Sequence, residues 1–203
     1  MVAAGQQAPG ATRWWWIRHA PVAAPAGMIL PRDMPADLDA GIEKTLAALR
    51  RRLPDPALYL ASTLPRATIS AAKLSHVPAQ RLAAFDEQNF GSWTGSTHQR
   101  LWDSGDPLYR AFWTDPAGTP PPDGESFSAQ CGRVGRAIDE LGAMHKGMDL
   151  VVVAHAGTIR AALALALELP TARALRFVID HLSLTRIVRL DGAWRVDQVN
   201  ARG

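Results

Sequence analysis

The chain has little of what disulfide-linked, metal-binding or nucleotide-binding proteins use. Its 203 residues include one cysteine, Cys131, so an intramolecular disulfide is excluded and a reducing, cytoplasmic compartment is expected. His76, His98, His145 and His181 fall in no H-x-H, H-E-x-x-H or cysteine-rich pattern, which argues against a metal site. No P-loop or G-x-G-x-x-G follows an apolar segment, so no nucleotide cofactor is expected.

Long hydrophobic runs are also missing. The longest helical apolar run, 161–167, lies between Arg160 and Glu168 and is too short to cross a bilayer. Residues 1–12 have neither a cationic start nor an apolar centre, so they match neither a secretory signal nor a membrane anchor. We expect a flexible N-terminal tail over 1–12 and no membrane partner.

Charge is balanced rather than concentrated. The 22 Lys and Arg against 19 Asp and Glu give a formal net charge of +3, and the one cationic run is Arg50-Arg51-Arg52. That run ends a predicted helix, where cations complement the helix dipole. A basic RNA-binding module, which would show steep salt dependence, is therefore the weaker alternative, and no nucleic-acid partner is expected.

Alternating strand and helix patterns over residues 13–203 predict a single α/β domain. The pattern indicates three layers, α/β/α, around a mixed and mostly parallel sheet. Strands are predicted over 14–17, 57–61, 81–85, 150–154, 176–179, 184–190 and 194–199, and helices over 37–52, 66–74, 126–145 and 157–170. Asp191-Gly192 predicts the turn of a closing hairpin. Residues 86–124 lack periodicity and are expected to form a lid segment.

Two of the predicted strands end in a histidine. The apolar run 14–17 leads into Arg18-His19, and the run 150–154 leads into His155. Parallel sheets bind ligands at the carboxyl ends of their strands, so both imidazoles are expected over one crevice. With arginines beside them, the expected occupant is an anion that imidazole can attack, above all a phosphoryl group.

Five residues can divide that chemistry between them. His19 is the expected nucleophile, because neighbouring positive charge disfavours its protonated form. Arg18 and Arg66, the latter in the first turn of a helix, offer donors that match phosphate oxygens. His155 precedes a helix N-terminus, which attracts anions, and is expected to donate to the phosphoryl oxygens. Glu87 is the expected acid for the leaving alcohol.

Glu87 is weighed against a simpler interpretation, since a loop glutamate is usually just solvated and Asp86 lies next to it. Phe85, Phe90 and Trp93 are nearby in sequence, and apolar neighbours would favour its protonated form. The lid tryptophans are as well explained by packing as by contact with the leaving group.

Together these residues resemble the histidine phosphatase superfamily, also called the phosphoglycerate mutase-like family. Five segments in the right order carry the resemblance: Arg18-His19-Ala20, 62–67 (S-T-L-P-R-A), 87–95 (E-Q-N-F-G-S-W-T-G), 122–126 (P-D-G-E-S) and 153–160 (V-A-H-A-G-T-I-R). The resemblance covers most of the chain. It implies a phosphoglycerate mutase-like fold, a phosphohistidine formed at His19, phosphate binding by Arg66 and proton donation by Glu87.

The chain departs from the family pattern at several positions. Ala20 and Ala156 stand where the pattern has glycine, which adds methyl groups where backbone approaches the ligand. The stretch 21–25 offers no Thr or Asn side chain. The Glu87 segment and the short chain resemble the phosphatase branch, including α-ribazole phosphatase-like proteins, more than the glycolytic mutases.

The sequence therefore predicts a metal-independent, cofactor-free phosphomonoesterase whose partner is a small-molecule phosphate monoester. Two alternatives stay open: phosphoglycerate mutase-type transfer, and a phosphate-ester-binding protein with little turnover. A homodimer is left open as well.

Overall fold

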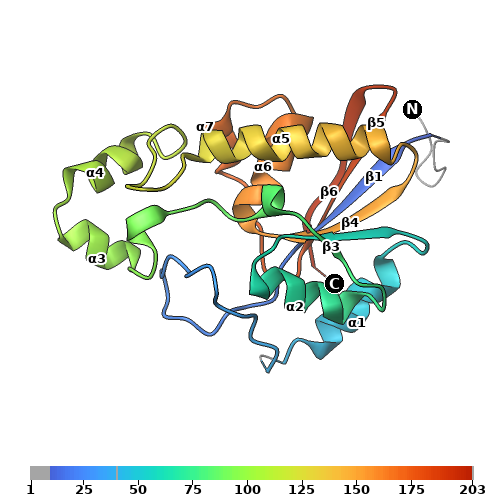
Figure 1. Cartoon of the computed structure of the whole chain (residues 1–203), viewed down its shortest axis with the longest axis horizontal. Helices are drawn as coiled ribbons and strands as arrows, with labels where there is room; N and C mark the ends of the chain where they lie inside the picture. Colours follow the sequence, from blue (N-terminus) through green and yellow to red (C-terminus); the bar gives the residue numbers. More distant parts are fainter. Residues whose placement is uncertain (1–9, 40, 203) are drawn as a thin grey trace.

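The computed structural model describes residues 10–39 and 41–202, and it contains one six-stranded sheet (Figure 1). The strand order is β3-β2-β4-β1-β5-β6. The strands are β1 (Thr12–Arg18), β2 (Leu58–Ala61), β3 (Gln80–Arg81), β4 (Asp149–Ala154), β5 (Leu184–Leu190) and β6 (Ala193–Ala201). The first four run parallel, whereas β5 is antiparallel to β1 and to β6. The predicted mixed, mostly parallel sheet is confirmed, as is the closing hairpin at Asp191-Gly192.

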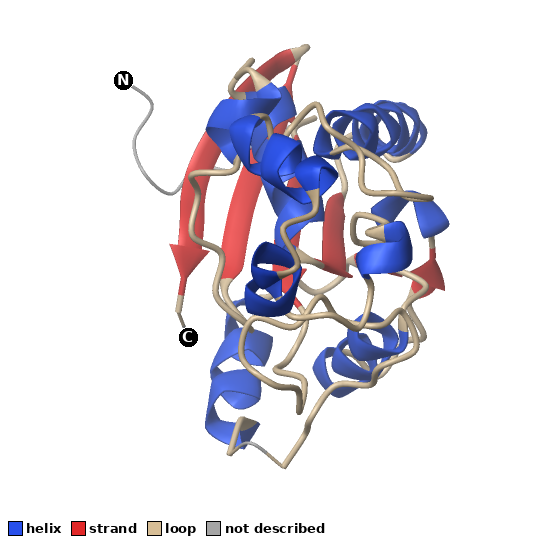
Figure 2. Cartoon of the chain, turned by 90° about the vertical axis from the view of Figure 1, so that its left-hand side faces the viewer, coloured by secondary structure: helices blue, strands red, loops and turns tan. Residues whose placement is uncertain are grey.

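Helices cover both faces of the sheet (Figure 2). One face packs against α1 (Glu43–Arg52) and α2 (Pro65–Leu74), and the other against α5 (Phe127–Met144) and α6 (Ala156–Ala166), with α7 (Thr171–Ala174) beside them. Successive strand side chains point to opposite faces. Trp14 and Trp16 therefore stack, at 5.7 Å, under α5 and α6, while Ile17 packs with α1 and α2. These are the three predicted layers.

The two histidine-ending strands are neighbours in the sheet. β1 pairs in parallel with β4, and Arg18 lies opposite Ala154, so His19 and His155 leave the same edge. The chain after β1 leads to α1 on one face, whereas the chain after β4 enters α6 on the other. Such a divergence opens a crevice at the carboxyl ends of the strands.

Helix α1 begins at Glu43, six residues after the predicted start at Asp37. Gly41 has a φ of +68°, a left-handed conformation that cannot continue a right-handed helix. The predicted helix end is confirmed, because Arg50, Arg51 and Arg52 form the last turn.

One predicted strand is much shorter than expected, and another is wrong. Over 81–85 only Arg81 pairs in the sheet, and Ala83–Phe85 forms a 3-10 turn, η1, that buries Phe85 edge-on against Trp16. Residues 176–179 form a loop. Its carbonyl groups accept hydrogen bonds from arginines instead of from a neighbouring strand: Phe177 from Arg160, and Ile179 from Arg18.

The lid segment, 86–124, contains regular structure that the sequence did not predict. After the 3-10 turn η2 (Gly91–Trp93), α3 (His98–Asp103) and α4 (Pro107–Thr114) project from one end of the molecule (Figure 1). Thr97 caps α3, and Asp106 caps α4 just before Pro107. Local capping thus forms helices too short to show clear periodicity.

Most of the predicted N-terminal tail, residues 1–9, lies outside the described residues. Within the described part, Ala11 is buried and Thr12 already pairs with Arg189 in β1. Ordered structure therefore begins before the predicted boundary at residue 13. Among the residues described, no helix is both long and apolar enough to span a membrane.

Candidate active site

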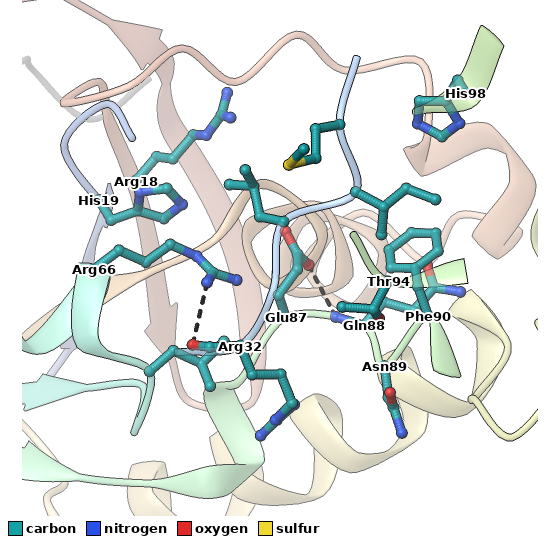
Figure 3. Close-up of a pocket in the computed structure, with 14 residues that line it drawn as sticks. Arg18, His19, Arg32, Arg66, Glu87, Gln88, Asn89, Phe90, Thr94 and His98 are labelled. Carbon is teal, nitrogen blue, oxygen red and sulfur yellow. Dashed lines mark hydrogen bonds between the residues drawn. The ribbon is translucent and has the colours of Figure 1, made fainter. Parts of the chain in front are cut away.

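A pocket of about 200 Å³ opens at the carboxyl end of β1. Arg18, His19 and Arg66 lie on one side of it, His98 lies at the far side, and Glu87 projects between them (Figure 3). His155 stands beside the nucleophile candidate, with its ring centroid 5.0 Å from that of His19. The structure thus brings together all five residues predicted to form the site.

His19 is held with one ring nitrogen available for attack. The residue is only 3% exposed. Nδ1 lies 2.6 Å from the carbonyl oxygen of Ala20, to which it can only donate, so the neutral ring carries its lone pair on Nε2. Burial first, then His155 and the guanidinium groups of Arg66 and Arg18, place the pKa of His19 well below its ordinary value. The imidazole is therefore neutral near pH 7, as a nucleophile requires.

The two arginines are fixed by backbone carbonyl groups. Arg18 Nη1 donates to Ile179 at 2.6 Å, and Arg66 Nη1 donates to Pro31 at 2.9 Å. Burial lowers the pKa of both groups and Glu87 opposes that effect, but both remain cationic. Their remaining N–H groups can bind the oxygens of an anion without reorganisation.

Glu87 is oriented by three N–H donors. Its Oε1 accepts from Gln88 N and Gln130 Nε2, both at 3.1 Å, and its Oε2 accepts from Gly157 N at 3.2 Å. Gly157 lies in the first turn of α6. A Cβ there would strike the Glu87 carboxylate and the Gln130 amide, so only glycine allows this approach.

The aromatic residues expected around Glu87 have three different positions. Phe90 lines the pocket, Phe85 packs in the core, and Trp93 packs edge-on against Tyr109 and Phe112 inside the lid. Trp102 and Trp113 are about half exposed and do not line the pocket. Packing thus explains the buried lid tryptophan better than contact with a leaving group.

His98 was not predicted to take part in the site, yet it lines the pocket. Its Nδ1 lies 2.8 Å from the hydroxyl group of Tyr109, and burial lowers the pKa of the ring. No spacing in the sequence indicates this, because the lid helices that place His98 were not predicted.

Sequence reasoning also missed a hydrogen-bonded group behind the pocket. Asp86, set aside in favour of Glu87, accepts from Ser62 Oγ and Thr63 N at 2.8 Å each and from Arg32 Nη2 at 2.6 Å. Ser62 Oγ lies 2.7 Å from Nε2 of His155. Ser62 and Thr63 directly follow β2, and they belong to the segment 62–67 that the sequence analysis singled out. Nothing in the sequence, however, links these two residues to Asp86.

His181 is another residue that the sequence did not indicate. Its Nδ1 lies 3.0 Å from the carbonyl oxygen of His19, and the two rings are 5.1 Å apart. It donates to the backbone of His19 and so fixes the start of the loop that follows β1.

The two alanines that replace glycines do not enter the pocket. Ala20 is fully buried in the apolar cluster under α1 and α2, and its N–H donates to Ser70 Oγ at 2.9 Å. Ala156 packs against the cluster on the other face. The added methyl groups are therefore accommodated in the core.

Acidic, thiol and imidazole side chains do not gather into a metal-binding group anywhere in the described part of the chain. The cations of the pocket would themselves repel a metal ion.

Comparison with known proteins gives a family match over nearly the whole chain. The model of the histidine phosphatase superfamily (branch 1) matches residues 14–202. The chain is 29% identical over 196 residues to the adenosylcobalamin/alpha-ribazole phosphatase of Salmonella typhimurium, covering 94% of this chain and 96% of that protein. It is 32% identical over 168 residues to the glucosyl-3-phosphoglycerate phosphatase of Mycolicibacterium vanbaalenii, covering 76% and 73%.

Solved structures agree with these sequence matches. The mycobacterial glucosyl-3-phosphoglycerate phosphatase superposes with a TM-score of 0.81 at 27% identity, covering 94% of this chain and 99% of that one. The alpha-ribazole phosphatase from Shigella flexneri superposes with a TM-score of 0.80 at 26% identity, covering 94% and 98%.

Proposed function

The chain belongs to the histidine phosphatase superfamily (branch 1), and from this we propose that it hydrolyses a small phosphate monoester through a phosphohistidine, without a metal or other cofactor. Named phosphatases among its relatives support a hydrolase of phosphate esters. The observation that carries the finer proposal is the free Nε2 of His19, which faces a pocket shared with three arginines and one carboxyl group.

The reaction has two steps. Nε2 of His19 attacks phosphorus, the ester P–O bond breaks, and protonated Glu87 gives its proton to the leaving alkoxide, which departs as the alcohol. Water then attacks the phosphohistidine, Glu87 takes back a proton from that water, and the P–N bond breaks. Inorganic phosphate leaves and His19 is regenerated.

Stabilisation of the transferring group falls to Arg18, Arg66 and His155. Charge spreads over the equatorial oxygens as phosphorus moves from one partner to the other, and fixed donors act most strongly there. The two guanidinium groups are already held by backbone carbonyls, so little reorganisation accompanies the reaction.

The other lining residues of the pocket indicate what kind of alcohol could leave from it. Besides His19, Glu87 and the arginines, the pocket is lined by five apolar side chains and by uncharged polar ones, with His98 at the end away from Arg18 and Arg66 (Figure 3); the apolar residues are Met28, Ile29, Leu30, Leu64 and Phe90, and the polar ones are Gln88, Asn89 and Thr94. We propose a leaving group with an apolar face and a neutral polar tip. Two relatives with different named substrates show that family membership alone does not choose the alcohol.

The proposal is tested by rapid-quench labelling with a radioactive phosphate ester. An acid-labile phosphoprotein is expected in the native chain, and His19→Ala is expected to abolish both the label and turnover. His76→Ala, at an exposed histidine, is the matched control and should label normally. Turnover without any acid-labile adduct would contradict the phosphohistidine.

Product analysis in the same experiment separates the alternatives. Release of inorganic phosphate from a panel of sugar, nucleoside and α-ribazole phosphates supports a phosphatase. Conversion of 3-phosphoglycerate to its 2-isomer would instead indicate a mutase. Binding of esters with no product of either kind would indicate the binding protein.

A further inference from the structure

A chain of hydrogen bonds runs from a buried carboxylate to the second histidine of the site. Asp86 Oδ1 accepts from Ser62 Oγ at 2.8 Å, and Ser62 Oγ lies 2.7 Å from His155 Nε2. All three side chains are buried, with Ser62 and His155 at 0% exposed. The proposed reaction assigns no role to Asp86 or Ser62.

The protons in this chain can be assigned from valence alone. A serine hydroxyl group has one proton and two lone pairs. The carboxylate of Asp86 only accepts, so the Ser62 proton points to it. The amide N–H of Leu64 donates to Ser62 Oγ at 3.1 Å, which occupies one lone pair. His155 Nε2 must then donate to the other lone pair, and the neutral ring is the Nε2–H tautomer.

This assignment leaves Nδ1 of His155 as the atom for the ligand. Nδ1 is buried and forms no hydrogen bond with the described residues, and the His19 ring lies 5.0 Å away. A lone pair there would repel a phosphoryl oxygen, whereas an N–H would bind it. His155 therefore has to take up a second proton when the anion enters.

We propose that Asp86 and Ser62 are positioning residues that hold His155 as its Nε2–H tautomer and stabilise its doubly protonated form when a phosphoryl group is bound. The inference deepens the proposed function and rests on it. Nδ1–H then donates to a phosphoryl oxygen, while the second proton comes from solvent or with the incoming monoanion.

The charges around His155 explain why such support is needed. Burial, followed by Arg66 and Arg18 and then by Arg133 and Arg32, lowers the pKa of the free ring well below its ordinary value. The groups facing it are Arg18 at the end of β1, His19 just after it, Arg66 from α2, Arg133 from α5, Arg32 from the loop after β1, and the carboxyl groups of Asp86 and Glu87. A bound phosphate offsets the excess of positive charge, and Asp86 adds a fixed negative charge that Ser62 relays to the ring.

A purely structural role for Asp86 is the competing explanation. It also accepts from both the N–H and the hydroxyl group of Thr63 and pairs with Arg32, so it fastens three segments together. The test therefore has to report the protons of His155 and not only activity.

Nitrogen-15 NMR of the histidine rings of the full chain gives that readout. The His155 signals are assigned by their loss in His155→Gln. Without ligand, Nε2 is expected to be protonated and Nδ1 unprotonated; with saturating inorganic phosphate, both are expected to carry protons. In Ser62→Ala, the free His155 ring is expected to be a mixture of its two neutral tautomers. Thr63→Val removes a hydroxyl group from Asp86 but keeps the Ser62 link, and should retain the Nε2–H tautomer.

A pH titration of the phosphate complex completes the test. In Ser62→Ala and Asp86→Asn the second proton of His155 should be lost at a pH about one unit or more below that of the native chain. Turnover should fall in kcat with little change in KM. An Nδ1–H tautomer in the native chain, or an unshifted titration in Ser62→Ala, would overturn the proposal. Because phosphohistidine labelling is measured separately, these outcomes leave the test of His19 untouched.

Discussion

At the scale of single residues, the pocket places an imidazole nitrogen that is free to attack opposite a carboxyl group that is held by hydrogen bonds. Burial and neighbouring cations keep His19 neutral, and its proton sits on the nitrogen that faces Ala20. Glu87 is fixed through three N–H donors and lines the same pocket. These placements fit the roles proposed for the two side chains, nucleophile for His19 and proton donor for Glu87.

This division of roles predicts how Glu87→Gln depends on the leaving group. The amide keeps the shape but cannot give a proton, so an alkyl phosphate with a strongly basic leaving alkoxide should lose about 10²- to 10⁴-fold in kcat. A nitrophenyl phosphate, whose phenolate needs no acid, should lose far less in the first step. Burst kinetics on both esters measure the difference, and equal losses for the two would argue that Glu87 only shapes the pocket.

At the scale of elements, the first turn of α6 carries part of the site. The Gly157 N–H binds Glu87 because the residue has no side chain, and the Thr158 hydroxyl group donates to the carbonyl oxygen of Phe85 at 3.0 Å. The helix start thereby ties β4 to the segment that carries the proposed acid.

Gly157→Ala should therefore damage catalysis without unfolding the protein. The new methyl group has to displace the Glu87 carboxylate, and a displacement of about 1 Å in a reacting group can cost roughly 100-fold in rate. The loss should be largest for the alkyl phosphate. Gly135→Ala is the matched control, since a Cβ at Gly135 has no atom within 4 Å. Replacing this helical glycine should stabilise α5 by up to about 1 kcal/mol. Full activity in Gly157→Ala would show that the placement of Glu87 is not critical.

The elements that could be predicted are those in which a helical pattern repeats over many residues or a buried apolar run occurs. β1, β4 and α5 follow from such patterns and were found within two residues of their predicted ends. The helices α3 and α4 have six and eight residues, too few to reveal a period, and their local signals are the caps at Thr97 and Asp106 and the proline at the start of α4.

At the scale of the whole molecule, strand ends made the candidate site predictable in part. His19 and His155 follow buried runs, and the rule for parallel sheets places both at one edge. Asp86, His98 and His181 reach the same region through loops and lid helices. Their positions depend on tertiary packing, for which a single sequence carries no spacing rule.

The two ends of the central strands have different roles: the pocket lies at their carboxyl ends, whereas a stabilising ion pair lies at their amino ends. At the edge opposite His155, Asp149 forms a two-pronged ion pair with Arg13, 2.7 Å on each side, and accepts from Trp15 Nε1 at 2.8 Å. The ion pair is nearly buried, with side chains 11% and 12% exposed. It joins the starts of β1 and β4 without touching the pocket.

Asp149→Asn should therefore lower stability and leave kcat/KM unchanged well below the melting temperature. Losing a charged partner of a mostly buried arginine costs about 1–3 kcal/mol, or several degrees in Tm. Asp139→Asn, which breaks an exposed pair with Arg189, should cost well under 1 kcal/mol. Thermal melts and kinetics on the same samples give both quantities, and reduced turnover at full stability would contradict the separation.

The pH dependence of folding provides the matching signature. Burial alone would raise the pKa of the Asp149 carboxyl group, but hydrogen bonds from Arg13 and Trp15 outweigh it and the pKa lies below the ordinary 3.8. The folded state therefore binds this proton more weakly than the unfolded state, so the contribution is complete above pH 3.8 and is lost as the pH falls through the lowered value. The difference in unfolding free energy between the native chain and Asp149→Asn should accordingly be constant near pH 7 and shrink on acidification below about pH 4. A difference that grows toward acid would place the stabilisation elsewhere in the sheet.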